Sequence, residues 1–294
     1  MLSPLHLLLI AGAAALLLGA AVTLAAAWLL AGQIIRRRSP DPPDPPERYG
    51  LTSTPVTIAA RDGLRIAGRL IGRGERPVVI FCPGINGSMD GDSHLLPAFD
   101  AAGLDVLQID WRAHGESEGE CCTLGVREVA DVLGALDFLA ARGVSRAGLM
   151  GFSMGGAVAL RTAAQDQRAA CVVCDGGFVD PRHAIEGALR ERTGRPLRLV
   201  ARLALWLAGL RCGVKLLEAS PLPHASAISP RPVLFIHGDA DPFVPIPAQD
   251  ALFAACGEPK TLWRVPGAGH REAHRLAPEA YRERITAFFR EHLS

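Results

Sequence analysis

A short stretch around Ser153 places the tightest constraint on what this chain can fold into. An apolar run, typical of a buried strand, ends at Gly151, and a helical pattern begins at Met154. The serine lies between them, in the pattern Gly151-Phe-Ser-Met-Gly155. A serine on so tight a strand-to-helix turn needs small neighbours, and the first N–H groups of the following helix are free to bind an anion. Because glycine-rich turns also carry such patterns by chance, the surrounding sequence has to decide the interpretation.

Strands and helices alternate along most of the chain after residue 50. Apolar runs predict strands at residues 78–82, 104–109, 170–174, 233–237 and 261–265, and a further strand that ends at residue 150. Helical patterns occupy residues 95–102, 126–141, 154–165, 248–255 and 278–292. The turn signal Arg61-Asp62-Gly63 adds a hairpin formed by residues 56–60 and 64–71. This alternation predicts an α/β fold with a mostly parallel sheet flanked by helices.

The interval from residue 178 to residue 230 breaks this rhythm. It contains helical patterns at 181–191, 197–210 and 214–218, separated by glycine and proline, which is more than one crossover requires. We therefore expect a small helical lid insertion over the edge of the sheet. The piece at 197–210 is rich in leucine and alanine with interspersed arginines. It fits either a lid that contacts an acyl chain or the membrane surface, or a packed helix with solvated arginines.

The N-terminal segment predicts one transmembrane helix. Residues 7–30 are almost wholly apolar and uncharged, and about 20 such residues span a bilayer core. We expect residues 1–35 to form a membrane anchor. A cleaved signal peptide is the alternative, but the basic start of such a peptide is missing and the apolar run is longer than usual. The flank Arg36-Arg37-Arg38 predicts that the rest of the chain lies on the cytoplasmic side.

Residues 36–49 form a basic, proline-rich linker. Five prolines lie between Ser39 and Glu47. Such a composition favours an extended polyproline conformation. We therefore expect a spacer that holds a folded domain of residues 50–294 away from the membrane.

Composition narrows the classes of function. The net charge of this 294-residue chain is +1, which gives no sign of a nucleic-acid partner. The seven cysteines are odd in number and scattered through apolar segments, so they do not predict a disulfide framework. Cys171-Val-Val-Cys174 has metal-ligand spacing, but no second ligand pair accompanies it. We expect buried thiols and neither a metal nor a cofactor.

Acyl transfer by a serine requires a base that takes the hydroxyl proton and an acid that orients the base. The candidate base is His270, in the glycine-rich turn Pro266-Gly-Ala-Gly-His270 after a predicted strand. His274 lies four residues further on and is the alternative.

The candidate acid is Asp241, which also follows the end of a predicted strand. Asp239 is the alternative, but a Gly-Asp pair is more typical of a turn. The chain order Ser153, Asp241, His270 is the order that serine hydrolases of this architecture use. Each of the three residues follows a strand, so all three are expected at the same edge of the sheet.

Two backbone N–H groups are expected to bind the oxyanion of the reaction. One belongs to Met154, the residue after the serine. The other should come from the loop Pro83–Ser88, which follows the strand at 78–82. Ile85 is the best candidate in that loop, whereas Pro83 has no N–H.

Four sequence blocks together resemble the α/β-hydrolase superfamily, in its serine aminopeptidase-like, lysophospholipase-like and esterase-like branch. The resemblance covers residues 50–294, and the blocks are Gly151-Phe-Ser-Met-Gly155, Asp110-Trp-Arg-Ala-His-Gly-Glu-Ser117, His237-Gly-Asp-Ala-Asp-Pro-Phe-Val-Pro245 and Gly269-His270. The resemblance implies an α/β-hydrolase fold, in which Arg112 and His114 brace the end of the sheet and take no part in a triad. One departure is Cys82-Pro83-Gly84, where the family usually has His-Gly.

These observations predict a membrane-anchored serine hydrolase that cleaves a carboxylic ester, thioester or amide through an acyl-enzyme. The substrate is expected to be a small-molecule or lipid-like acyl compound. An esterase is favoured over a peptidase, because no acidic site for a substrate amine can be placed. Two alternatives remain: an acyltransferase or perhydrolase with the same triad, and a catalytically idle binding protein on the same fold.

Overall fold

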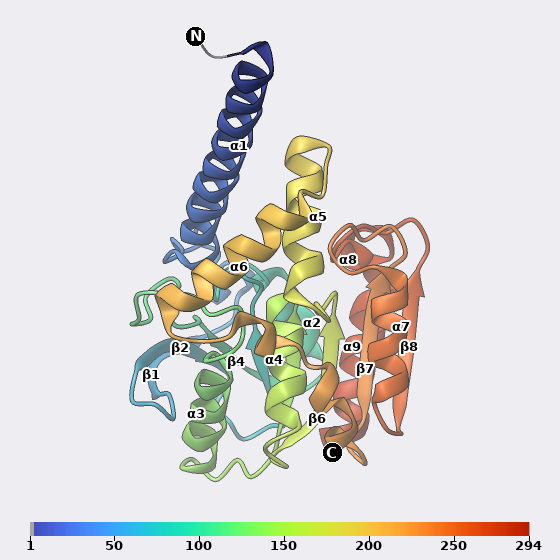
Figure 1. Ribbon diagram of the computed structural model, residues 1–294. Helices are drawn as coiled ribbons and strands as arrows, with labels where there is room; N and C mark the ends of the chain where they lie inside the picture. Colours follow the sequence, from blue (N-terminus) through green and yellow to red (C-terminus); the bar gives the residue numbers. More distant parts are fainter. Residues whose placement is uncertain (1–2, 294) are drawn as a thin grey trace.

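The computed structural model describes residues 3–293 and is built around an eight-stranded sheet (Figure 1). The strand order is β1-β2-β4-β3-β5-β6-β7-β8. The pairs β1–β2 and β2–β4 are antiparallel, and every other neighbouring pair is parallel. The strands are β1 (Ser53–Ala59), β2 (Arg65–Ile71), β3 (Val78–Cys82), β4 (Asp105–Ile109), β5 (Ala147–Phe152), β6 (Ala169–Asp175), β7 (Val233–Gly238) and β8 (Lys260–Val265). The predicted mostly parallel α/β sheet is confirmed.

Helices cover both faces of this sheet. On one face lie α3 (Val129–Ala140), α4 (Met154–Ala163) and α7 (Ile246–Ala255), and on the other lie α2 (Leu96–Ala101) and α9 (Pro278–Leu293), which the short α8 (Ala273–Leu276) precedes. Side chains alternate along each strand, so that Ile80 packs with the first group and Phe81 with the second. The strands from β3 to β7 are therefore buried on both faces, which explains their continuous apolar runs.

The helical patterns between β6 and β7 are present as helices. They comprise α5 (Pro181–Thr193), α6 (Arg198–Cys212) and the two 3₁₀ turns Leu216–Ala219 and Leu222–Ile228. Because α5 follows β6 closely, these helices rise from the edge where the parallel strands end (Figure 1). α6 then packs against the last turns of the N-terminal helix.

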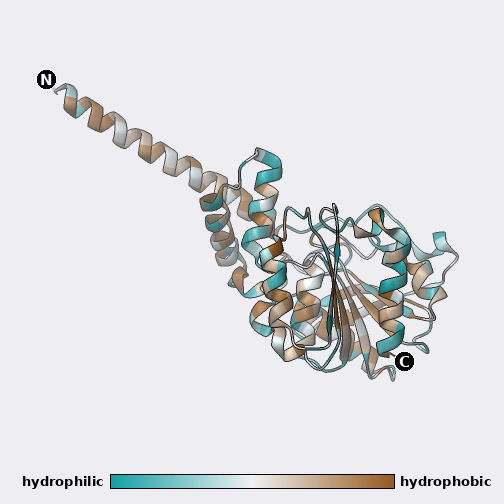
Figure 2. Cartoon of the chain, turned by 90° about the vertical axis from the view of Figure 1, so that its right-hand side faces the viewer, coloured by the Kyte–Doolittle hydropathy of each residue, from teal (hydrophilic) through white to brown (hydrophobic). Residues whose placement is uncertain are grey.

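The N-terminal helix α1 (Pro4–Ile35) is long and apolar enough to span a membrane. Its first two-thirds project away from the rest of the protein (Figure 2), and residues 4–26 are almost fully exposed. That exposed part is about 35 Å long at ~1.5 Å per residue, which exceeds a bilayer core of about 30 Å. The final turns behave differently, because Ala27, Ala31 and Ile34 are buried against the folded domain.

The linker differs from the spacer that its composition predicts. Arg36 and Pro45 do have extended, polyproline-like backbone angles, with ψ of 151° at both residues. However, the linker lies on the domain surface, where Arg38 pairs with His114 in a parallel β-bridge and Pro46 is buried. Proline content fixes the extended conformation, but the backbone polar groups still find partners on the domain, and this holds the linker in place.

Two aspartates of α3 bind arginines in very different surroundings. Asp131 is 0% exposed and lies 2.6 Å from a terminal nitrogen of the buried Arg112, which also binds Asp62 at 2.6 Å. Asp137, by contrast, is 45% exposed and binds two partly exposed arginines, Arg61 at 2.9 Å and Arg168 at 2.6 Å. Arg112 thus braces the end of the sheet, as the family resemblance implies.

We predict that Asp131→Ala lowers the free energy of unfolding by about 3 kcal/mol, because it leaves the buried Arg112 charge poorly compensated. The matched variant Asp137→Ala should cost less than about 1 kcal/mol, since both of its ion pairs are accessible to solvent. Thermal unfolding followed by circular dichroism measures both variants. Equal losses would show that Arg112 contributes no more than a surface ion pair.

Candidate active site

Ser153 lies on a strained turn between β5 and α4, with φ of 53° and ψ of −114°. Such backbone conformations cost about 1–3 kcal/mol and persist only where the surroundings enforce them. A Cβ atom added to Gly155 would lie 1.9 Å from the carbonyl oxygen of Cys82, and one added to Gly151 would lie 2.5 Å from that of Gly155. Both glycines are therefore sterically required, as the sequence pattern indicates. The Ser153 N–H donates to the carbonyl of Asp175 at 2.8 Å and fixes the turn.

The structure brings Ser153, His270 and Asp241 into one hydrogen-bonded chain. His270 Nε2 lies 2.8 Å from Ser153 Oγ, and His270 Nδ1 lies 2.7 Å from Asp241 Oδ2. The Asp241 side chain is 0% exposed, and its second oxygen accepts the N–H groups of Phe243 at 2.7 Å and Val244 at 3.0 Å. A carboxylate held in this way fixes the imidazole with Nε2 free to accept the serine proton.

The two alternative residues lie outside this chain. His274 Nδ1 is 2.7 Å from the carbonyl of Arg271. Asp239 instead accepts the N–H of Gly267 at 2.6 Å, 28 residues further along the chain, and so joins the turn after β7 to the turn after β8.

A buried charge cluster supports the loop that carries His270. Arg271 has a left-handed φ of 58°, and its guanidinium carbon lies 4.5 Å from the centroid of the Phe152 ring. The same guanidinium pairs with Asp92 and lies 3.8 Å from Asp175, which in turn accepts the Tyr281 hydroxyl at 2.8 Å. Burial alone would lower the pKa of Arg271, but the two carboxylates hold it above its usual range. Burial also raises the pKa of Asp175.

Arg271 and Asp92 were not predicted from the sequence. Position next to His270 is the only signal that marks Arg271. Asp92 lies 179 residues before its partner, and no local pattern reports a contact of that kind.

The predicted oxyanion loop, Pro83–Ser88, lies beside the serine turn and is held by ring nitrogens. Trp111 donates from Nε1 to the carbonyl of Pro83 at 2.8 Å. His114 Nε2 lies 2.7 Å from the carbonyl oxygen of Ile85, so His114 has the bracing position that the resemblance implies. The preceding Cys82 is buried within β3, and its burial raises the pKa of the thiol.

A cavity of about 740 Å³ opens over Ser153 and His270. Both predicted oxyanion donors, Ile85 and Met154, line it. The Met154 N–H is the first of α4 and has no carbonyl within the helix to bind. Other parts of the wall come from α5 and the residue Phe178 before it, from the C-terminal end of α1, and from the linker. These lining residues include Phe178, Ala184, Ile185, Ala188 and Arg192, then Leu30 and Ile34, and finally Arg36, Arg38 and Asp41.

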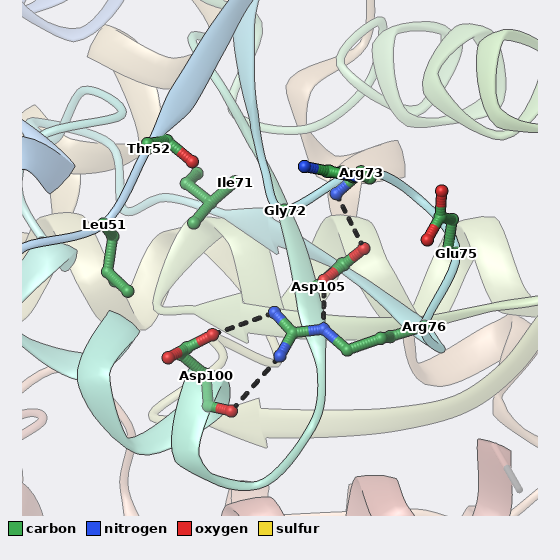
Figure 3. A pocket seen from close by; sticks show the side chains of 9 residues that line it. All are labelled: Leu51, Thr52, Ile71, Gly72, Arg73, Glu75, Arg76, Asp100 and Asp105. Atoms are coloured by element: carbon green, nitrogen blue, oxygen red, sulfur yellow. Dashed lines mark hydrogen bonds and ion pairs between the residues drawn. The ribbon is translucent and has the colours of Figure 1, made fainter.

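A second hollow, of about 270 Å³, lies near the turn between β2 and β3 and contains none of the triad residues (Figure 3). Its polar groups bind one another. The buried Asp105 accepts the N–H groups of Arg73 at 3.1 Å and Gly74 at 2.6 Å, and it also binds Arg76 at 2.5 Å. Arg76 reaches Asp100 as well, at 2.9 Å. This arrangement clamps the turn, so the hollow is not a candidate catalytic site.

All seven cysteines are free. Cys171 and Cys174 belong to the apolar clusters on opposite faces of the sheet, so their thiols point away from each other. Burial raises the pKa of Cys171 to about 12. Thiols in such surroundings stay protonated at neutral pH and are inert.

Comparison with known proteins agrees with this architecture. Residues 77–216 match the family described as alpha/beta hydrolase fold. An uncharacterised protein of Mycobacterium tuberculosis is 29% identical over 242 residues, which cover 80% of this chain and 79% of that protein. The uncharacterised protein YqkD of Bacillus subtilis is 26% identical over 261 residues, with 87% of this chain and 85% of that protein covered.

Among solved structures, the esterase Pf2001 of Pyrococcus furiosus superposes with a TM-score of 0.73. The two share 22% sequence identity, and the match covers 89% of this chain and 99% of the esterase. The chain therefore has the α/β-hydrolase fold, as its sequence blocks predict.

We predict that Asp241→Asn lowers turnover of an activated ester by roughly 10²- to 10⁴-fold, because the imidazole loses its orienting carboxylate. Asp239→Asn, two residues away, should change turnover less than about threefold, because Asp239 does not bind His270 and the amide oxygen of Asn can still accept the N–H of Gly267. Steady-state kinetics of both variants test the assignment. A larger effect at Asp239 would transfer the acid role to that residue.

Proposed function

We propose that this protein is a serine hydrolase that cleaves a carboxylic ester, thioester or amide through an acyl-enzyme. The observation that carries the proposal is the hydrogen-bonded chain from Ser153 through His270 to the buried Asp241, with contacts of 2.8 Å and 2.7 Å. It opens into a cavity of about 740 Å³, large enough for a small acyl compound.

In this mechanism Ser153 Oγ attacks the substrate carbonyl while His270 Nε2 takes the hydroxyl proton. Asp241 stabilises the resulting imidazolium, and the N–H groups of Ile85 and Met154 bind the oxyanion. Collapse of the tetrahedral intermediate breaks the bond to the leaving group, which receives the proton from His270. Water then attacks the acyl-serine by the same route and regenerates the free serine.

We favour an ester of a small or lipid-like acid over a peptide as the substrate. Phe178, Ile185 and Ile34 give it an apolar wall, which suits an acyl chain. The esterase Pf2001 has the same fold, and this adds weight to ester cleavage. Acyl transfer to an alcohol in place of water is the second candidate, and product analysis with alcohol acceptors separates it from hydrolysis.

We predict that a fluorophosphonate probe forms an adduct on Ser153 of the full-length protein, located by mass spectrometry. Ser153→Ala should abolish both adduct and turnover while the thermal transition stays within a few degrees, since a half-buried hydroxyl contributes only about 1 kcal/mol. His270→Ala should retain little labelling. A folded Ser153→Ala protein with normal turnover would refute the mechanism and favour a different nucleophile. Lack of labelling in folded wild-type protein would favour a binding protein.

We also propose that α1 anchors the protein in a membrane, with the hydrolase fold on the cytoplasmic side. The apolar part of α1 and the arginines that follow it support this orientation. An exposed apolar surface on α6 also supports membrane binding. Leu199, Trp206 and Leu210 form one exposed stripe along α6, each more than 59% exposed, beside the base of α1. An apolar stripe flanked by arginines, next to a spanning helix, suits the headgroup boundary of a bilayer.

We predict that brominated lipids quench Trp206 fluorescence when the full-length protein is reconstituted in vesicles. The loss of quenching in Trp206→Phe should exceed the loss in the matched variant Trp263→Phe, because Trp263 lies on β8, remote from α1. Equal quenching in both variants would show that α6 faces water or a second copy of the chain.

A further inference from the structure

We propose that the juxtamembrane segment Arg36–Asp41 is a working part of the active site, because it positions the oxyanion loop Pro83–Ser88. Arg38 is the main positioning residue, and it acts through Asn86. The inference rests on the proposed serine-hydrolase function and assigns a catalytic consequence to a segment whose composition indicates only a spacer.

Hydrogen bonds to the folded domain fix the segment Arg36–Asp41 in place. The Arg38 N–H donates to the carbonyl of Ala113 at 2.8 Å, and its carbonyl accepts the N–H of Gly115 at 3.2 Å. The Arg37 guanidinium donates to the carbonyls of Gly115 and Ser117, both at 2.8 Å. The segment therefore docks on the loop after β4 much as an added strand would, and its side chains have defined positions.

Arg38 connects this segment to the oxyanion loop. The side chain is buried, with 7% of the residue exposed. Its Nε donates to Asn86 Oδ1 at 3.1 Å, and a terminal nitrogen donates to the carbonyl of Ile34 at 3.0 Å. Ile34 lies in the last turn of α1, so one guanidinium ties the end of that helix to the loop.

Asp41 and Ser88 form a reciprocal contact two residues further along the oxyanion loop. Asp41 Oδ2 accepts the N–H of Ser88 at 2.6 Å and its hydroxyl at 3.1 Å. The Asp41 N–H in turn donates to Ser88 Oγ at 2.9 Å. Asn86 and Ser88 are thus both held from the juxtamembrane side, whereas Pro83 and Ile85 are held from the domain side by Trp111 and His114.

Position matters because an oxyanion donor acts only within a narrow range of geometry. A displacement of about 1 Å can cost roughly a hundredfold in rate. Two glycines, at positions 84 and 87, make the loop pliable, and its internal bond joins the N–H of Gly87 to the carbonyl of Gly84 at 3.0 Å. Bonds at Asn86 and Ser88 restrict that freedom and would hold the Ile85 N–H where the proposed mechanism requires it.

A double-mutant cycle in the full-length protein tests the inference. Arg38→Met and Asn86→Ala should each lower kcat for p-nitrophenyl butyrate by roughly 10- to 100-fold, with KM changed less than about threefold, because the donor matters most in the transition state. The double variant should resemble either single variant, since both remove the same link. Arg38→Lys should recover part of the rate. Arg48→Ala is the matched control, because Arg48 binds Asp44 at 2.9 Å outside the cavity.

A second pair of variants covers a failure of Arg38→Met to fold. Asp41→Asn keeps an acceptor for the Ser88 N–H and should retain most of the rate, whereas Asp41→Ala should lose roughly tenfold in kcat. Thermal unfolding of each variant separates lost activity from lost structure.

The outcomes distinguish this inference from the proposed function. Unchanged kcat in the Arg38, Asn86 and Asp41 variants, or independent multiplication of the Arg38 and Asn86 effects, would overturn the positioning role and leave the hydrolase assignment intact. Failure of folded wild-type protein to label or turn over would overturn the hydrolase assignment itself.

Discussion

Contact between the backbone of the Ser153 turn and the end of β3 is the constraint on which the site depends. Gly155 approaches the Cys82 carbonyl so closely that a methyl group has no room. This approach places the start of α4 next to the loop that leaves β3, so Met154 and Ile85 line one cavity with Ser153. A side chain at position 155 would force the ends of β3 and β5 apart and separate the proposed oxyanion donors from Ser153.

The central strands were predictable because burial on both faces demands uninterrupted apolar residues. The prediction for β3 matches the structure at both ends, and the prediction for β4 differs by one residue. The outer strand β1 begins three residues earlier than predicted, since four of its seven residues are exposed and only Ile58 is buried, which leaves a weaker apolar pattern. The triad candidates could be chosen because chain order and position after a strand both restrict the choice.

Contacts between distant polar groups had no such signal. The pairing of Arg271 with Asp92 joins two loops, and a single charged residue in a loop leaves no periodic trace. The contact between the linker and the domain surface could not be predicted for a related reason. Proline content specifies an extended backbone. The surface on which that backbone lies is determined by hydrogen bonds to carbonyl groups such as that of Ala113. Every residue has such a carbonyl group, so the sequence does not mark the ones that bind. Only the assembled fold shows that Arg38 reaches Asn86.

The burial of Ala27, Ala31 and Ile34 in the domain has a mechanical consequence. A helix whose last turns are packed in this way cannot pivot freely at its base, so α1 and the hydrolase fold would rotate together as one rigid body. The exposed length of α1, about 35 Å at ~1.5 Å per residue, slightly exceeds a typical bilayer core, and helices meet such a mismatch by tilting. If α1 spans a bilayer, as we propose, the bilayer thickness would set the tilt of the whole protein, and with it the angle between the mouth of the cavity and the lipid surface.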